Sequence, residues 1–180
     1  MSARTRLDTS HRAWLLGWML LFSLTARSEE NMHFHGALVM KPCVVASESE
    51  RSEVNLGNIR LESLHDQGRT PGTAFALRLE QCDISAAKHG VRVTFRGDES
   101  DRRGMLTLAP GSQAGNIVIG LETAEGEALP LGTPSAAQAL VEGENLLRFK
   151  AYAERLGADP QSAITPGTFS AVASFEVSYE

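Results

Sequence analysis

The amino-acid sequence predicts an all-β protein, built as an antiparallel sandwich or barrel. Short segments in which apolar and polar residues alternate follow one another along the chain. Such alternation places the apolar side chains on one face of a strand. Pieces rich in glycine and proline, such as residues 68–72 and 157–167, separate these segments, and no segment shows the 3.6-residue repeat of a long helix. Short, regularly spaced strands with turns between them are typical of a sandwich or barrel.

The alternating segments define the strands that we expect, in chain order. A short strand is expected at 53–59 ("EVNLGNI"), and residues 61–68 fit a single helical turn. The other expected strands lie at 73–82, 90–95, 104–111, 115–122, 145–154 and 168–180. The last of them carries the longest clean alternation in the chain, with six aligned side chains: Phe169, Ala171, Ala173, Phe175, Val177 and Tyr179.

The first 28 residues have the pattern of a secretory signal peptide. Arginines at 4, 6 and 12 precede an apolar run at 13–26, and small residues stand where a signal peptidase would read them before residue 29. An uncleaved membrane anchor is the competing interpretation. Removal of this segment leaves 13 basic and 21 acidic residues, a net charge of −8. This charge argues against nucleic acid or an anionic membrane as a partner, and we expect no membrane insertion of the mature chain.

Two cysteines in the mature chain, Cys43 and Cys82, predict a disulfide bond, because an exported chain with an even cysteine count is typically disulfide-bonded. Metal binding is the rival use, but two cysteines so far apart lack the spacing of a ligand pair. Cys82 has the opposite parity to Leu77 and Leu79 in its strand. If the disulfide points inward, a bulge or bend is therefore expected near Gln81.

No constellation of side chains points to catalysis. His33 and His35 share one face of a strand, but no third metal ligand follows nearby, which favours a solvated face over a metal site. The acidic pairs at 125/127 and 142/144 lie in turn-like polar segments. The motifs of hydrolase nucleophiles, zinc proteases and phosphate-binding loops are absent. We therefore expect no enzyme, no metal and no cofactor.

The segment "NMHFHGALVM" (residues 31–40) carries an apolar stripe broken by one glycine. As an extended strand it would align five side chains on one face: Met32, Phe34, Gly36, Leu38 and Met40. The strand could pair inside its own sheet, or it could fill a gap in the sheet of a neighbouring molecule. In the second case Gly36 fits a shallow point of the accepting groove, whereas in an ordinary strand it only weakens packing.

Four segments together carry a family resemblance: "FHGALVMKPC" at 34–43, "FALRLEQC" at 75–82, "AGNIVIGL" at 114–121 and "PGTFSAVASFEVSYE" at 166–180. A glycine stands fourteenth from the C-terminus, at Gly167, and a tyrosine is next to last, at Tyr179. With these features the whole mature chain resembles the pilins of chaperone–usher fimbriae, and more narrowly the minor tip-fibrillum subunits of P-pilus-type fimbriae.

The resemblance implies an incomplete immunoglobulin-like β-sandwich of six strands, whose seventh strand is supplied in trans. The pilin domain would span residues 42–180, preceded by a donor-strand extension at 29–41. The disulfide would tie the first strand to the strand that ends at 82. The implied donor residues are Met32, Phe34, Gly36, Leu38 and Met40. The implied acceptor groove would bind a strand of the chaperone first and, at the usher, the strand that replaces it. It comprises Gly167, Phe169, Ala171, Ala173, Phe175, Val177, Tyr179 and Glu180.

The function implied is that of a structural minor pilus subunit, a tip adaptor or tip-fibrillum subunit that supports cell adhesion. Its partners would be a periplasmic chaperone, an outer-membrane usher and neighbouring subunits, and it would pass through the periplasm to a pilus on the bacterial surface. A carbohydrate-binding adhesin domain is the alternative, although the mature chain leaves no room for a lectin domain ahead of the pilin domain. A third alternative, a self-contained periplasmic β-domain or enzyme, would instead be stable without any partner.

Overall fold

The computed structural model describes residues 35–36, 42–85, 90–157 and 163–179. The chain divides into two units, residues 1–38 and 39–180, and the fold described below is that of the second unit. Six strands and two short helices follow one another: β1 (Val44–Val45), α2 (Ser47–Glu50), α3 (Leu61–Gln67), β2 (Thr73–Cys82), β3 (Val91–Gly97), β4 (Ile117–Thr123), β5 (Gly143–Arg155) and β6 (Ala173–Tyr179). Neither helix in the described residues is long and apolar enough to cross a membrane.

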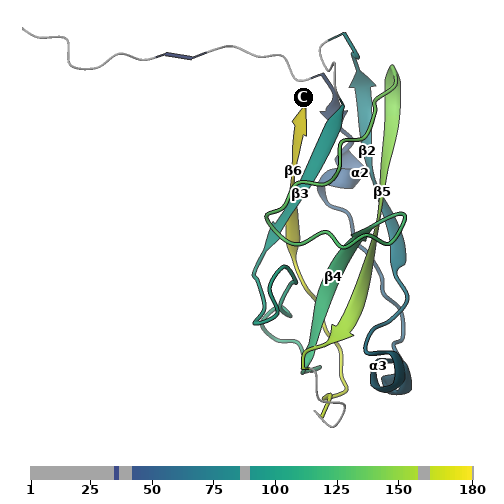
Figure 1. Ribbon diagram of the computed structural model, residues 1–180, viewed down its shortest axis with the longest axis vertical. Helices are drawn as coiled ribbons and strands as arrows, with labels where there is room; N and C mark the ends of the chain where they lie inside the picture. The colour runs from purple at the N-terminus through teal and green to yellow at the C-terminus, as the bar shows by residue number, and fades with distance from the viewer. Residues whose placement is uncertain (1–34, 37–41, 86–89, 158–162, 180) are drawn as a thin grey trace, which may run out of the picture. The chain divides into compact units, whose positions relative to one another are not determined.

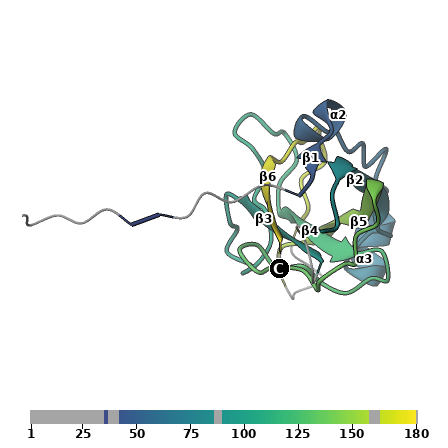
Figure 2. The same cartoon turned by 90° about the horizontal axis from the view of Figure 1, so that it is seen from above.

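The strands form two antiparallel sheets that face each other. One sheet has the order β1-β2-β5-β4, and the other consists of β3 and β6 (Figure 1). Seen from above, β3 and β6 lie on one side of the domain, opposite β2 and β5 (Figure 2). The expected all-β fold is therefore confirmed.

The strand order is that of an immunoglobulin-like sandwich. In the seven-stranded form of that fold, strands A, B, E and D make one sheet and strands C, F and G make the other. With β1 to β6 taken as A to F, the first sheet matches the order A-B-E-D. The second sheet contains C and F, and the described residues supply no strand at the position of G, next to β6.

An aromatic cluster connects the two sheets in the core. The ring of Phe149 on β5 lies 5.1 Å from the ring of Phe95 on β3 and 5.8 Å from that of Phe75 on β2. Phe95 and Phe149 meet edge to face, an arrangement that adds about 0.5–1.5 kcal/mol to the burial of the rings. Leu77 and Leu147, a cross-strand pair of β2 and β5, are both buried beside this cluster.

The predicted disulfide and the predicted bulge are both present. Cys43 and Cys82 are bonded to each other and buried. Gln81 has a positive φ of 52°, and the register of β2 with β5 shifts between Leu79 and Cys82. This shift turns Cys82 to the same side as the buried Leu79, as the parity argument requires.

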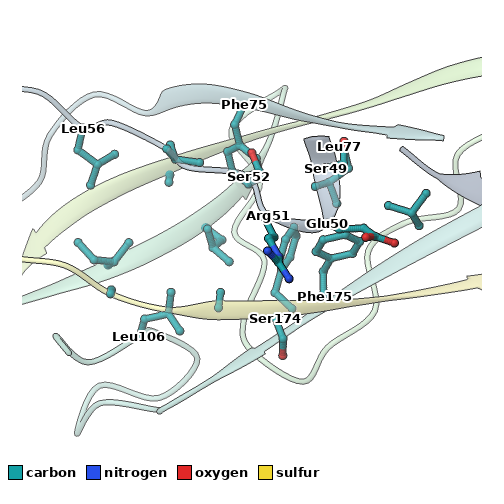
Figure 3. A pocket seen from close by; sticks show the side chains of 18 residues that line it. Ser49, Glu50, Arg51, Ser52, Leu56, Phe75, Leu77, Leu106, Ser174 and Phe175 are labelled. Carbon is teal, nitrogen blue, oxygen red and sulfur yellow. The ribbon is translucent and has the colours of Figure 1, made fainter. Parts of the chain in front are cut away.

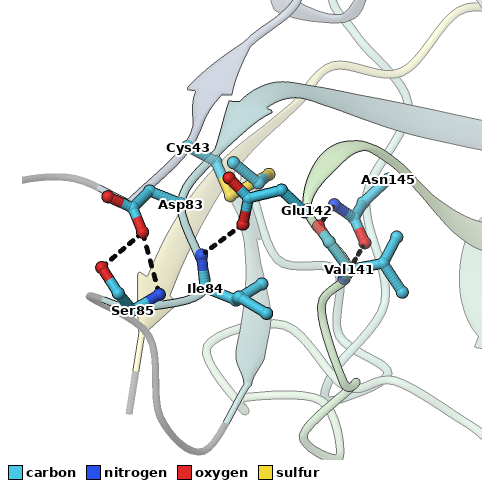
Figure 4. The surroundings of a disulfide bond; sticks show 8 residues. Cys43, Asp83, Ile84, Ser85, Val141, Glu142 and Asn145 are labelled. Carbon is cyan, nitrogen blue, oxygen red and sulfur yellow. Dashed lines mark hydrogen bonds between the residues drawn. A yellow bond between two sulfur atoms is a disulfide. The ribbon is translucent and has the colours of Figure 1, made fainter.

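The disulfide lies at the end of the domain from which the chain continues toward residue 41. There the backbone N–H of Asp83 donates to the carbonyl of Pro42 at 2.7 Å. The N–H of Ile84 donates to the Glu142 carboxylate at 3.2 Å (Figure 4). Residues 42–43 are therefore fastened to the end of β2 by one covalent bond and one backbone hydrogen bond.

Three of the expected elements differ from the structure. Residues 53–59 form no strand, because Gly57 adopts a φ of 69° and its N–H donates to the Asn55 side chain at 2.8 Å. Residues 104–111 form no strand either, and Leu106 makes only isolated bridges, to Glu99 and Ile119. The single helical turn expected at 61–68 is a seven-residue helix, α3.

The last strand is also shorter than expected, since β6 begins at Ala173 and not at 168. The residues before it are hydrogen-bonded to a loop. The carbonyl of Thr168 accepts from the N–H groups of Gln113 and Ala114, and the carbonyl of Ser170 accepts from Ala109. This loop therefore takes the place of a sheet partner for the first part of the alternating segment.

Candidate functional site

An apolar groove of about 540 Å³ lies between the two sheets, beside β6. Its lining comes from both sheets, from Leu106 and from the segment that follows β1. The side chains from the sheets are Val45, Phe75, Leu77, Phe95, Ile119, Leu121, Ala151, Ala173, Ser174 and Phe175. Because Phe75, Leu77 and Phe95 also belong to the main core, the groove gives access to the interior of the sandwich. Figure 3 shows Phe75 and Leu77 along one side of it and Phe175 and Ser174 along the other.

The edge of β6 beside this groove is open. One edge of β6 pairs with β3 from Ala173 to Tyr179. Within the described residues, no backbone hydrogen bond joins the other edge of β6 to a further segment. A free strand edge presents a row of unpaired N–H and C=O groups, which another strand can satisfy.

The outer edges of β3 and β4 are covered by loops. The outer edge of β3 exchanges hydrogen bonds of 2.8–2.9 Å with Gln138, and its residue Phe95 accepts from Gly132. On the outer edge of β4, Ile119 exchanges hydrogen bonds of 2.9–3.0 Å with Leu106. Within the described residues, loops thus protect the outer edges of β3 and β4, whereas the edge of β6 beside the apolar groove has no such cover.

Side chains of β6 and of the residues before it alternate along the groove. Phe175, Val177 and Tyr179 are half-buried and pack against the main core, whereas the residues between them are exposed. Ala171 and Ala173 also line the groove, and their small side chains leave its wall shallow. Burial raises the pKa of the Tyr179 phenol, because the phenolate would lose its hydration.

The segment after β1 forms the opposite wall, and the sequence did not indicate this role. The hydroxyl of Ser49, in α2, accepts a hydrogen bond of 2.8 Å from the Arg78 N–H of β2. The carboxylate of Glu48 lies 3.3 Å from the Arg78 side chain. These contacts fix α2 against β2, so that the residues after the helix run along the groove with Val54 and Leu56 turned into it. The alternation of Val54 and Leu56 was the available signal, and it predicted a strand.

A second pocket of about 370 Å³ is lined by the next part of the same wall. Leu56 lines both cavities, which places them next to each other. Apolar side chains from 56–64 and 164–169 line the second pocket, together with Ile117. Gly167 lies on its rim, and a Cβ there would come within 2.6 Å of the Gln113 side chain. Only glycine fits this position without displacing the loop.

The predicted acceptor residues thus fall into three sets. Ala171, Ala173 and Phe175 line the first groove, whereas Gly167 and Phe169 line the second pocket. Val177 and Tyr179 pack against the core near the end of β6. Glu180 lies outside the described residues, as do four of the five predicted donor residues: Met32, Phe34, Leu38 and Met40. Gly36 is described, and its predicted role as a donor position stays a prediction.

A buried charged cluster on the outer face of the four-stranded sheet is fully paired. The Arg69 guanidinium lies 2.7 Å from the buried Glu122 carboxylate and 3.6 Å from the centre of the Tyr152 ring. Burial raises the pKa of Tyr152, and the nearby Glu154 carboxylate adds to this effect. Because each charged group of this cluster has a partner, removal of one partner would leave an uncompensated charge in the sheet.

The chain is similar in sequence to fimbrial subunits. A family model described as "Fimbrial protein" matches residues 32–180. The "Major MR/P fimbria protein" of Proteus mirabilis (strain HI4320) is 35% identical over 147 residues, which cover 82% of each chain. The "Fimbria A protein" of Serratia marcescens is 35% identical over 151 residues, again with 82% of each chain covered.

The chain is also similar to solved pilus structures. The P pilus rod subunit PapA shares 26% identity, with a TM-score of 0.65, over 78% of this chain and all of that one. A subunit in the structure of a chaperone–usher pilus shares 25% identity, again with a TM-score of 0.65, over 86% of this chain and 97% of that one. These similarities support the immunoglobulin-like fold and agree with the family resemblance of the sequence.

Proposed function

The chain belongs to the fimbrial protein family of chaperone–usher pilus subunits, and we propose that it enters its pilus by donor-strand exchange, both accepting and donating a strand. As a member of this family it is a structural subunit of a surface pilus, where it associates with other subunits, and not an enzyme. The proposal concerns how that association is made and which residues make it.

The observation that carries the proposal is the open edge of β6 beside the apolar groove. A strand at this position would complete the C-F-G sheet of the immunoglobulin-like fold. Its backbone would pair with the free edge of β6, and its alternate side chains would cover Phe75, Leu77 and Phe175. Pairing of an added strand through its backbone, with side chains in pockets, is the recurrent mode of β-strand addition.

The donor that we propose is the N-terminal extension, residues 29–41, of a neighbouring subunit. In this chain its side chains Met32, Phe34, Leu38 and Met40 would enter the groove of the next molecule, with Gly36 at a shallow point. Burial of four large apolar side chains contributes roughly 6–12 kcal/mol before the cost of ordering the strand. Such a contribution would make the link between subunits slow to dissociate.

Before assembly the same groove would be occupied by a strand of a periplasmic chaperone, with the outer-membrane usher as the site of exchange. An open edge and an exposed apolar groove expose a subunit to aggregation, so it needs a transient partner until the next subunit arrives. The signal-like segment at 1–28 is consistent with passage through the periplasm.

Within the pilus, we propose that the chain is a minor subunit at the tip, an adaptor or tip-fibrillum subunit that supports adhesion. This position rests on the resemblance of the sequence motifs described above. Labelling of intact pili with antibodies to this chain tests it, because a tip subunit marks one end of each fibre and a rod subunit marks the whole shaft.

The proposed exchange is tested by thermal unfolding of two periplasmically expressed forms. The first form comprises residues 42–180. The second comprises the same residues followed by a flexible linker and then residues 30–41. We expect the added strand to raise the unfolding midpoint by on the order of 10 °C or more, since each 1 kcal/mol is worth about 2–8 °C in a domain of this size. Equal midpoints for the two forms would contradict the proposal.

The matched control is the same fusion with Phe34→Ala in the added strand only. Loss of one large aromatic side chain from a filled groove costs about 3–5 kcal/mol. We therefore expect this control to lose much of the gain in midpoint. A gain that survives this substitution would mean that the linker or the extra residues stabilise the domain without filling the groove.

A further inference from the structure

Exposed apolar side chains gather at the end of the domain that carries the disulfide. Val44 directly follows Cys43. Ile84 lies two positions after Cys82, and Val141 lies two positions before the β5 residue that pairs with Cys82. These three side chains, called the end patch below, belong to the five large hydrophobic side chains that are exposed in the described residues: Val44, Ile84, Val141, Leu146 and Val172. Single exposed apolar residues are ordinary on a protein surface, whereas a group at one end is a candidate contact surface.

The backbone beneath the end patch is held by hydrogen bonds. The N–H of Ile84 donates to the Glu142 carboxylate at 3.2 Å. Val141 is fastened twice to the buried Asn145: its N–H donates to the side-chain oxygen at 2.8 Å, and its carbonyl accepts from the side-chain nitrogen at 2.7 Å. Figure 4 shows Ile84, Glu142 and Val141 next to one another at this end. A surface that is already ordered loses little conformational entropy when a partner packs against it.

The N-terminal extension is joined to this end of the domain by a very short link. Met40 is the last apolar position of the donor stripe, and Cys43 is fixed by the disulfide. Only Lys41 and Pro42 lie between them. Three residue steps of extended chain span at most about 11 Å. When Met40 is seated in the groove of a neighbouring subunit, Cys43 therefore lies within about 11 Å of that residue's place in the groove, and the end patch around Cys43 faces that neighbour.

The direction of the accepted strand decides which end of the neighbour the patch meets. The sheets of an immunoglobulin-like sandwich are antiparallel, so the C-terminal end of an accepted strand lies beside the first residues of β6. In this chain Val172, which is 72% exposed, immediately precedes β6. A neighbour of the same fold thus receives the disulfide end of its donor where β6 begins, and at that place this chain itself offers an exposed apolar side chain.

From the position of the patch and the length of the link we infer that Val44, Ile84 and Val141 form a second contact surface between consecutive subunits, outside the acceptor groove. The surface packs against the subunit that holds the N-terminal strand of this chain, at the end where β6 of that subunit begins. The inference rests on the proposed strand exchange and adds a contact between domains to it. Such a contact stiffens the link, since bending at Lys41 and Pro42 must first separate the two apolar surfaces.

The test places a photoreactive side chain at single positions of the complete chain in intact pili. p-Benzoylphenylalanine replaces Ile84 or Val141 in the end patch, and it replaces His35 to report which subunit holds the extension. Arg148 is the control position, because it is exposed in the middle of β5, where it pairs with Ala76. Mass spectrometry after irradiation identifies the subunit joined to each position. We expect positions 84 and 141 to be joined to the same subunit as position 35, and this adduct to be absent from position 148.

A second measurement tests the contribution of the contact to the strength of the link. Ile84→Ser is compared with Leu146→Ser, a matched control, because the two side chains are isomers that are 46% and 42% exposed and Leu146 lies on β5 outside the end patch. Pili with each variant are held in guanidinium chloride, and the separation of the chain from the neighbour that holds its extension is followed over time. We expect Ile84→Ser to separate about three- to tenfold faster than the wild-type chain, because the exposed half of an apolar side chain is no longer buried at the contact. Leu146→Ser should separate at the wild-type rate.

Cross-linking from position 35 without cross-linking from positions 84 and 141 would overturn the inference while leaving strand exchange intact. Adducts of positions 84 and 141 with a different subunit, or separation of Ile84→Ser at the wild-type rate, would overturn it as well. If position 35 is joined to no other subunit, the proposed strand exchange fails and the inference fails with it.

Discussion

A larger side chain on the wall of the groove should prevent a donor strand from binding there. The substitution Ala173→Leu tests this expectation. Ala173 is the first residue of β6, pairs with Gly97 and lines the groove with an exposed side chain. A leucine there would project into space that the accepted strand is proposed to occupy. In the empty groove the same leucine meets solvent, so the free energy of unfolding of the isolated domain should change by less than about 0.5 kcal/mol.

The cost to strand binding has two parts. The leucine takes the place of one apolar donor side chain, whose burial is worth about 1.5–3 kcal/mol. Any strand that still enters would be overpacked against it, at a further cost of about 1–3 kcal/mol. The two parts together amount to about 2.5–6 kcal/mol, which corresponds to roughly two to four orders of magnitude in the dissociation constant.

The assay is competition for the groove between a labelled donor peptide and an unlabelled one, read by fluorescence anisotropy. Val172→Leu serves as the control, because Val172 is 72% exposed and does not line the groove. We expect Val172→Leu to bind like the wild-type chain and Ala173→Leu to bind at least a hundredfold more weakly. A folded Ala173→Leu variant with unchanged affinity would refute the assignment of this groove as the acceptor.

Two further predictions concern the sandwich itself. Leu147→Ala should lower the free energy of unfolding by about 2–5 kcal/mol, because the Leu147 side chain is buried, with 2% exposed. Leu146→Ala, at the neighbouring position where 42% is exposed, should lower it by less than about 1 kcal/mol. Urea denaturation measures both, and equal costs would contradict the inward orientation of Leu147. The double substitution Cys43→Ala and Cys82→Ala should lower the free energy of unfolding by about 4 kcal/mol, because the two cysteines are 39 residues apart in the sequence. Reduction of the wild-type chain should reproduce this loss in the same urea denaturation. An unchanged denaturation midpoint after reduction would mean that the bond does not constrain the unfolded chain as the loop length requires.

The parts of the fold that could be predicted from the sequence are those in which alternation and burial coincide. Val91, Val93 and Phe95 are buried in β3, as their alternation predicts, because each strand in the centre of the sandwich has one face toward the core. The bulge at Gln81 was also predictable, since a buried disulfide and buried leucines of opposite parity cannot share one regular strand.

The errors have a common physical cause, because alternation does not reveal what pairs with a strand. Residues 53–59 alternate and turn Val54 and Leu56 into the groove, but a local turn at Gly57 interrupts the segment. The first residues of the last alternating segment, up to Ser170, hydrogen-bond with a loop. In both cases the alternating apolar side chains do pack against the core, but the hydrogen-bond partner depended on tertiary structure.

The candidate site shows the same division. The aligned side chains of β6 were predictable as a face, whereas Arg51 was not, because its place in the groove depends on the anchoring of α2 by Ser49 and Glu48. A charged residue in a polar segment carries no sequence signal of this kind. The polar residues that line a groove are therefore found from the structure more readily than from the sequence.

The open edge of β6 connects the stability of the subunit to its assembly. Because the groove reaches Phe75, Leu77 and Phe95, a strand accepted there would cover part of the core itself and not a separate surface. The free energy of strand binding would then also be free energy of folding, and the apparent stability of the domain would depend on the concentration and affinity of its partner. A weak donor would leave the domain only marginally more stable, whereas a strong one would hold it folded under load.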